Sequence, residues 1–190
     1  MFYKFLVLTK QMPPIVLTFK IFMIYVYCDH ITKLTNNNLV MEYTLNIEIK
    51  IPRNQVVEKF NNEENMKHWQ KGFVSMEHIS GTKGKTGAIS KLIYKMGKRE
   101  IEMIETITLL DLPESFHLTF DAKNVYNIQE NYFEELSNGN TKWISKNEFK
   151  FSGFMKLMGF LMPGAFKKQS YTYMEDFKAF AEEGKSVLDN

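Results

Sequence analysis

Cysteine is almost absent from this sequence, since Cys28 is the only one among 190 residues. A disulfide within the chain is therefore excluded, and a reducing compartment, the cytoplasm, is the default expectation. The sequence also has no large excess of charge of either sign, because 24 basic and 22 acidic residues leave a formal charge of +2. No basic stretch is interleaved with aromatic residues, so we do not expect nucleic acid as a partner.

Residues that could bind a metal or act as nucleophiles do not cluster along the chain. His68, His78 and His117 fall on different expected elements, with no other histidine or carboxylate at ligand spacing beside them. The zinc and iron ligand patterns are therefore absent. A nucleophile elbow and a glycine-rich phosphate loop after a strand are absent too. We expect no metal, no cofactor and no catalytic triad.

The sequence also lacks an apolar run long enough to cross a membrane. The most apolar stretch, residues 13–27, is interrupted by Lys20 and falls short of the roughly 20 residues that a spanning helix needs. No small-residue cleavage site follows it, which argues against a signal peptide. Residues 1–40 hold four lysines and one aspartate, a formal charge of +3 that leaves −1 for the rest.

We therefore expect residues 1–40 to be an extension outside the domain, with translation beginning at Met41. Two alternatives remain open for this segment, a weak membrane anchor and a helix packed on the domain. Stable insertion into a membrane is not expected.

From Met41 onward the pattern predicts one domain, residues 41–184, followed by a tail, residues 185–190. Apolar and polar residues alternate from Tyr43 to Ile51, as in a strand with one buried face. Two short helices and a run of strands follow. The expected later strands span residues 73–80, 86–96, 99–110, 115–122, 125–136 and 141–151.

Two local signals shape the second half of the domain. Asn138-Gly139 between two alternating strands predicts a type I′ hairpin turn with Gly139 at positive φ. From Phe154 the apolar residues recur at helical spacing, which predicts a long C-terminal helix that Pro163-Gly164 must kink or split. The predicted fold is α+β, with a curved antiparallel sheet of six to seven strands wrapped around this helix.

The order of these elements is the helix-grip layout, and the sequence resembles the SRPBCC (START-like) superfamily, in particular its polyketide cyclase/dehydrase and lipid-transport group. The resemblance is carried by YTLNIEIKIPRNQVVEKFNNEENMKHWQKGF, YKMGKREIEMIETI and KWISKNEFKFSGFMKLMGFLMPGAFKKQSYTYMEDFKAF. It implies the fold and an internal cavity for a small hydrophobic molecule. It does not imply one function, because the superfamily includes carriers, receptors and cyclases.

The expected ligand-binding residues lie on one strand and on the C-terminal helix. Glu105 shares a strand face with apolar neighbours, so on the concave face it would be a carboxyl in apolar surroundings with a raised pKa. Alternatively, the opposite face points inward and Glu105 pairs with a lysine outside; Glu100 and Glu102 on that face favour the first orientation. The full expected set is Ile101, Met103, Glu105, Ile107, Phe154, Met158, Leu161, Phe166 and Tyr173.

A second polar set lies on the hairpin strands, where Asn127, Gln129 and Asn131 alternate along one strand and Trp143, Ser145 and Asn147 along its partner. One interpretation places this row in the cavity, where it would offer directed hydrogen bonds. The other places it on the convex, solvated face, which Tyr126, Ile128 and Tyr132 on the opposite side favour.

The sequence thus favours non-catalytic binding or carriage of a small hydrophobic, lipid-like or polyketide-like ligand. The alternatives are a cyclase or dehydratase that uses Glu105 with a tyrosine as acid and base, and a regulatory domain that binds a partner. The oligomeric state is not indicated.

Overall fold

The computed structural model describes residues 39–189, and the prediction for residues 1–38 lies outside this part of the chain. The first strand begins at Leu39 and pairs along its whole length. The elements are, in chain order, β1 (Leu39–Ile49), α3 (Arg53–Asn61), the 3-10 helix η2 (Glu63–Asn65), α4 (Met66–Trp69), β2 (Phe73–Ser80), β3 (Ile89–Met96), β4 (Arg99–Asp111), β5 (Ser115–Ala122), β6 (Val125–Glu135), β7 (Thr141–Phe151), α5 (Gly153–Leu161), α6 (Pro163–Glu183) and the 3-10 helix η3 (Val187–Asp189).

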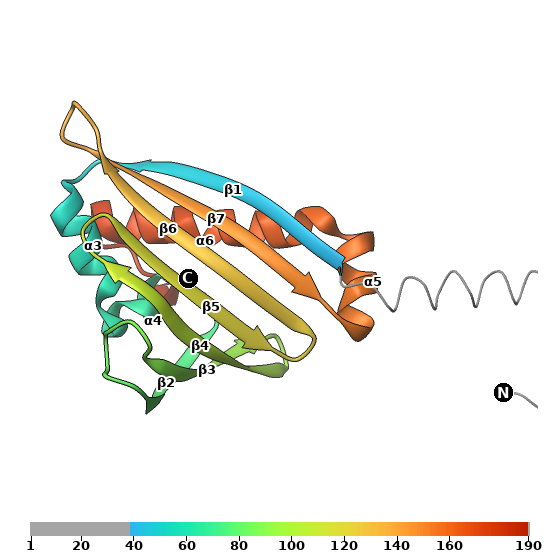
Figure 1. Cartoon of the computed structure of the whole chain (residues 1–190). Coiled ribbons are helices and arrows are strands. Elements are labelled where there is room, and N and C mark those ends of the chain that lie inside the picture. The colour runs from blue at the N-terminus through green and yellow to red at the C-terminus, as the bar shows by residue number, and fades with distance from the viewer. Residues whose placement is uncertain (1–38, 190) are drawn as a thin grey trace, which may run out of the picture. The chain divides into compact units, whose positions relative to one another are not determined.

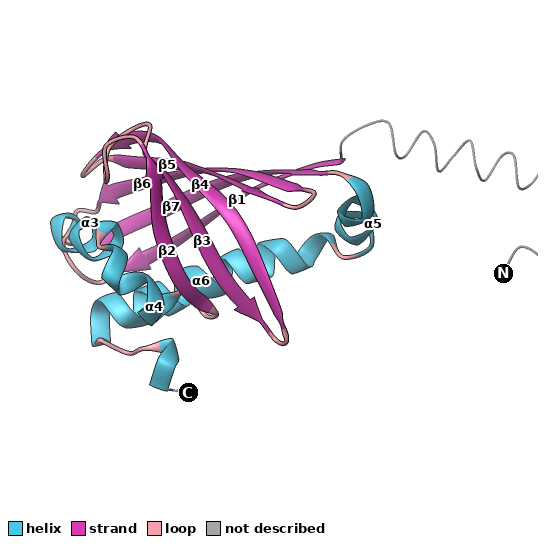
Figure 2. Ribbon diagram, turned by 90° about the horizontal axis from the view of Figure 1, so that it is seen from below, coloured by secondary structure: helices cyan, strands magenta, loops and turns pink. Residues whose placement is uncertain are grey.

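The seven strands form one antiparallel sheet in the order β1-β7-β6-β5-β4-β3-β2. Strands β2 to β7 follow one another as a meander, and β1 joins at the far edge by pairing with β7. The sheet is strongly curved, and α6 runs along its concave side (Figures 1 and 2). This confirms the predicted α+β helix-grip architecture.

The core lies at one end of the concave face, where α3 and α4 meet α6. Phe60 is its centre, with ring centroids 5.5 Å from Trp69, 5.1 Å from Trp143 and 5.4 Å from Phe177. Most of these rings meet edge to face, the arrangement that the aromatic quadrupole favours. This aromatic cluster fixes the two short helices and the second half of α6 against the sheet.

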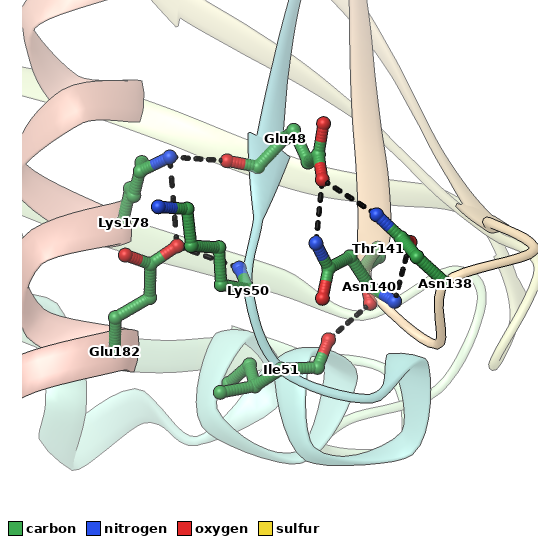
Figure 3. Close-up of polar contacts among 8 residues, drawn as sticks. All are labelled: Glu48, Lys50, Ile51, Asn138, Asn140, Thr141, Lys178 and Glu182. Atoms are coloured by element: carbon green, nitrogen blue, oxygen red, sulfur yellow. Dashed lines mark hydrogen bonds and ion pairs between the residues drawn. The ribbon is translucent and has the colours of Figure 1, made fainter.

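Polar contacts fasten the end of β1 to α6 (Figure 3). Lys178 Nζ donates to the backbone oxygen of Glu48 at 2.6 Å, and Glu182 Oε1 accepts from the backbone nitrogen of Lys50 at 2.6 Å. The Glu48 carboxylate also accepts hydrogen bonds from Asn138 Nδ2 at 3.2 Å and Asn140 Nδ2 at 2.5 Å, and these bonds lower the pKa of Glu48. Strand β1, the β6–β7 hairpin and α6 are thereby tied together.

The β6–β7 turn confirms one part of the prediction and corrects another. Gly139 has a φ of +80°, as expected. Asn138, however, is not at positive φ, which a type I′ turn would require. Instead Gly139 N donates to Leu136 O, and Leu136 N donates to Asn140 O, so the loop has three residues. This is a tight turn followed by a left-handed glycine, the next most common hairpin connection.

Candidate functional site

A partly open cavity of about 580 Å³ lies between the concave face of the sheet and α6. Most of its lining is apolar or aromatic, supplied by α3, α4, the sheet and α6. Apolar lining residues include Phe60, Met66, Trp69, Met76, Leu118, Phe120, Phe149 and Met174.

The structure brings together six of the nine residues that the sequence predicted for the site. Ile101, Met103, Glu105 and Ile107 alternate along β4 and line the cavity; Phe166 and Tyr173 of α6 line it as well. On the sheet side, the period-two pattern was sufficient to find them. Phe166 and Tyr173 lie seven residues apart, two turns of α6, so they share one face of that helix.

The prediction that Phe154, Met158 and Leu161 line the cavity is wrong. Phe154 is 67% exposed and Leu161 62% exposed, and Met158 does not contribute to the lining. The reason is a break at Met162 (φ −133°, ψ 55°), which divides the expected helix into α5 and α6. Because of this break, the apolar side chains of α5 no longer continue the cavity-facing side of α6.

Glu105 is buried in the cavity wall, which confirms the concave orientation. Only 7% of its surface is exposed, and among the described residues its carboxyl group has no hydrogen-bond partner. It lies between Ser90 of β3 and Phe120 of β5 in the sheet register. Burial raises the pKa of Glu105 to about 7, and the negative charge of Glu63 contributes in the same direction. The carboxyl therefore titrates near neutral pH.

Two tyrosines reach the cavity near this wall. Tyr94 of β3 is 7% exposed and donates a hydrogen bond to Gln70 Oε1. Burial raises the pKa of Tyr94 well above its usual value, with smaller contributions from Tyr173 and Glu105. Burial also raises the pKa of Tyr173. Both phenols are therefore neutral hydrogen-bond donors at physiological pH.

The polar row of the hairpin strands lies inside the cavity, so the convex placement favoured by the sequence is wrong. Asn127, Gln129, Ser145 and Asn147 all line the cavity. The aromatic residues on the convex face misled the prediction, because they are covered by lysines rather than by the core. Lys146 Nζ, for example, lies 4.8 Å from the ring centroid of Tyr132.

A hydrogen-bond network holds the polar row in place, and its donors and acceptors can be assigned. The indole N–H of Trp143, which can only donate, is bonded to Asn131 Oδ1 at 3.0 Å. Asn131 Nδ2 donates in turn to the backbone oxygen of Phe116 at 3.1 Å. Asn131 is 0% exposed, so it supports the row from behind and does not face the cavity. These two bonds fix the orientation of the Asn131 amide, and its Oδ1 in turn accepts from Gln129 Nε2.

Donor groups of the row are used within the protein, and acceptor oxygens remain. Asn127 Nδ2 donates to the backbone oxygens of Ile128 and Glu148, each at 3.2 Å. Gln129 Nε2 donates to Asn131 Oδ1 at 3.4 Å and Ser145 Oγ at 3.2 Å. No hydrogen bond among the described residues uses Asn127 Oδ1 or Gln129 Oε1. The cavity therefore offers unsatisfied acceptors on this side, in addition to the Glu105 carboxyl.

Within residues 39–189, no group of three or more histidine, cysteine or carboxylate residues is placed to hold a metal ion. Two of the histidines lie within hydrogen-bond distance of other protein atoms: His68 Nδ1 lies 3.0 Å from Ser186 Oγ, and His78 Nε2 lies 3.0 Å from Gly81 O. None of the helices described is both long and apolar enough to cross a membrane.

Comparisons with solved structures identify the fold. The allergen Ara h 8.0201 superposes with a TM-score of 0.60 at 12% identity, covering 80% of this chain and 100% of its own. Norcoclaurine synthase from Thalictrum flavum, solved with dopamine and hydroxybenzaldehyde, gives 0.60 at 13% identity over 80% and 92% of the two chains. A protein from Thermus thermophilus gives 0.60 at 12% identity over 77% and 100%.

This is the helix-grip fold of the Bet v 1 type. No protein-family model matches the chain, and no curated protein matches it in sequence. At these identities the likeness concerns the fold alone, and the function has to be argued from the cavity.

Proposed function

We propose that this chain binds a small, mostly apolar molecule in the cavity without catalysing a reaction on it. The observation that carries this proposal is the cavity itself. Its volume of about 580 Å³ falls within the range of roughly 300–1,000 Å³ that is usual for small-molecule sites. Its apolar lining with a few convergent polar groups is the expected composition of such a site. The proposed binding residues are Ile101, Met103, Glu105, Ile107, Phe166 and Tyr173.

The unsatisfied acceptors define the polar part of the ligand. Asn127 Oδ1, Gln129 Oε1 and the Glu105 carboxyl can each accept a hydrogen bond from a bound molecule. A ligand that excludes water from these oxygen atoms without supplying donors loses affinity, so a ligand that bears donors is favoured. We therefore expect an apolar body bearing hydroxyl or amino groups. An anionic head group would be disfavoured because it would meet oxygen atoms and a carboxyl that titrates near neutrality.

A cyclase or dehydratase is the second candidate, and the carboxyl of Glu105 is the observation that favours it. A pKa of about 7 suits a group that both accepts and returns a proton at neutral pH. A hydrogen bond between the Glu105 carboxyl and a tyrosine would favour the enzyme. Tyr94 instead donates its hydrogen bond to Gln70, and this arrangement supports the binding function over the enzyme.

The superfamily and compartment are also part of the proposal. The three sequence segments quoted above and the shared fold support membership of the polyketide cyclase/dehydrase and lipid-transport group of the SRPBCC superfamily. The near absence of cysteine supports a cytoplasmic location.

Native mass spectrometry of the freshly purified protein would reveal a co-purified molecule directly. A titration with the neutral apolar dye Nile red tests the cavity, and we expect one dye per chain. Met103→Trp should fill the space and abolish dye binding, whereas Leu109→Trp is the matched control, because Leu109 is on the same strand but is 39% exposed and outside the lining. Equal dye binding by both variants would contradict the proposal.

The chemistry of the ligand can be tested by displacing the dye with matched competitors. Dodecylamine, dodecanol and dodecanoate share one alkyl chain and differ in the head group. We expect the amine and the alcohol to compete better than the carboxylate, and Glu105→Gln to reduce the advantage of the amine over the alcohol. Preference for the carboxylate would refute the donor-bearing ligand while leaving the binding function intact.

A further inference from the structure

The outward face of α5 is apolar, although it faces away from the core. Phe154 is 67% exposed, Phe160 68% and Leu161 62%. Residues 154, 157 and 161 recur at the spacing of one helix face, and Leu157 and Met162 are each 51% exposed. We call these five residues the α5 apolar face: Phe154, Leu157, Phe160, Leu161 and Met162.

The opposite side of α5 fixes this orientation. Gly159 is buried, and a Cβ atom there would lie 3.0 Å from Phe151 and 3.1 Å from Leu39. The glycine thus lets the helix lie close against β7 and β1, and its large side chains are left outside. Single exposed apolar residues are ordinary, but a contiguous group on one helix marks an interaction site. Figure 1 shows α5 at the end of the sheet where β1 begins.

The sequence that contains this face carries charge of one sign. Between Glu148 and Glu175 the sequence contains no acidic residue and four lysines. Two of them, Lys167 and Lys168, are exposed on the first turns of α6, directly after the α5 apolar face. Phenylalanine and leucine side chains beside lysines are the composition of helices that lie in the interface of an anionic membrane.

The charge of the residues that precede the domain does not complement the charge near the α5 apolar face. Residues 1–38 join the domain at Leu39, beside Gly159, and carry four lysines and one aspartate. A basic segment is poorly suited to cover a basic face, because like charges repel. A basic and apolar sequence that precedes the domain, and a basic and apolar helix within it, instead favour a common partner of opposite charge. An anionic lipid surface meets both requirements, the apolar and the electrostatic.

We propose that the α5 apolar face, with Lys167 and Lys168, docks this protein onto anionic membrane surfaces. The helix would lie in the interfacial plane, with Phe154, Phe160 and Leu161 among the acyl chains and the lysines at the head groups. Met155 and Phe166, which flank this face, line the cavity. Docking therefore brings the adjacent end of the cavity to the lipid surface. The proposal concerns a surface and does not depend on the identity of the ligand.

Sedimentation with lipid vesicles tests this proposal on the full chain. We expect the protein to bind vesicles of phosphatidylcholine with 30% phosphatidylserine, to bind pure phosphatidylcholine vesicles weakly, and to dissociate at high salt. Lys167→Gln combined with Lys168→Gln should weaken binding roughly 25-fold, since each lysine near such a surface contributes about fivefold. Phe160→Ser with Leu161→Ser should weaken it by a similar or larger factor.

A matched control variant distinguishes binding through the α5 apolar face from nonspecific binding through other exposed apolar residues. Val74 and Ile79 of β2 are each 52% exposed, so Val74→Ser with Ile79→Ser removes similar apolar area elsewhere and should leave binding unchanged. Absence of vesicle binding would overturn the proposal, as would equal binding by the Phe160→Ser, Leu161→Ser variant. The latter result would place the binding outside the α5 apolar face.

Discussion

Replacing Glu105 with glutamine should remove a pH dependence that this buried carboxyl gives to folding stability. Burial raises the pKa of Glu105 to about 7 in the folded protein, from an ordinary value of 4.5. Between these two pH values the folded protein retains a proton that the unfolded chain has already released. The free energy of unfolding therefore falls as the pH rises from 4.5 to about 7, and then levels off.

The size of the effect follows from the difference between the two pKa values. Each pKa unit corresponds to about 1.4 kcal/mol, so the full change is about 3 kcal/mol. Glutamine has nearly the same shape and stays neutral. The variant should therefore match the wild-type protein near pH 4.5 and exceed its stability by about 3 kcal/mol at pH 8, which raises the melting temperature by roughly 6–12 °C.

Urea denaturation between pH 4.5 and pH 8 measures this difference, with the fluorescence of the buried Trp69 and Trp143 as the signal. Glu102→Gln is the control, because Glu102 lies on the same strand with its side chain exposed. A stability difference between wild type and Glu105→Gln that stays constant with pH would refute the reasoning, and would mean that the carboxyl is charged and compensated in the folded protein.

Three further predictions concern the fold. Gly139→Val should destabilise the domain by roughly 1–3 kcal/mol, because valine is strained at a φ of +80°; urea denaturation would measure the loss, and an unchanged midpoint would contradict it. Asn131→Leu should cost roughly 1–3 kcal/mol by leaving the buried Trp143 indole N–H without its acceptor, and an equally stable variant would show that this bond is not needed. A chain beginning at Leu39 should melt at the temperature of the full chain, whereas one beginning at Met41 should melt lower, because Leu39 packs beside Gly159; calorimetry of the three chains decides this.

The sheet could be predicted closely because a strand carries its own signal. Along β4, alternation alone placed Ile101, Met103, Glu105 and Ile107 on one face, and the two glutamates on the other face indicated which side is solvated. The same reasoning failed on β6, because each face of that strand carries both polar and apolar side chains. Tyr126 and Tyr132 are amphipathic, and lysines beside them cover the rings on the outer surface. Which face is inside then depends on the neighbouring chain segments, which a single sequence does not show.

The helical part of the site was harder to predict for a different reason. The apolar residues of α5 and α6 fit the pattern of one continuous helix in the sequence. Met162, however, leaves the helical conformation, and the apolar sides of the two helices therefore face in different directions. Pro163 predicted a break, while the rotation across the break depends on backbone angles that have no signature in composition. Cavity residues on other elements, such as Gln70 and Tyr94, were missed because only the folded chain brings the residue after α4 into hydrogen-bond contact with β3.

The ties between β1 and α6 have a mechanical consequence for the cavity. Lys178 and Glu182 fasten the C-terminal half of α6 to the sheet, and Phe177 is fully buried beside them. The cavity is lined by the part of α6 that precedes them, from Ala165 to Met174. The N-terminal half is held to the sheet by a different and smaller set of contacts: the hydroxyl oxygens of Tyr43 and Ser170 lie 2.8 Å apart, and the Phe166 ring centroid lies 4.7 Å from that of Phe151. Widening the cavity at the end that begins at Pro163 would break these few contacts, whereas widening it at the other end would disrupt the aromatic cluster around Phe60. We therefore expect the Pro163 end of α6 to move first when the cavity widens.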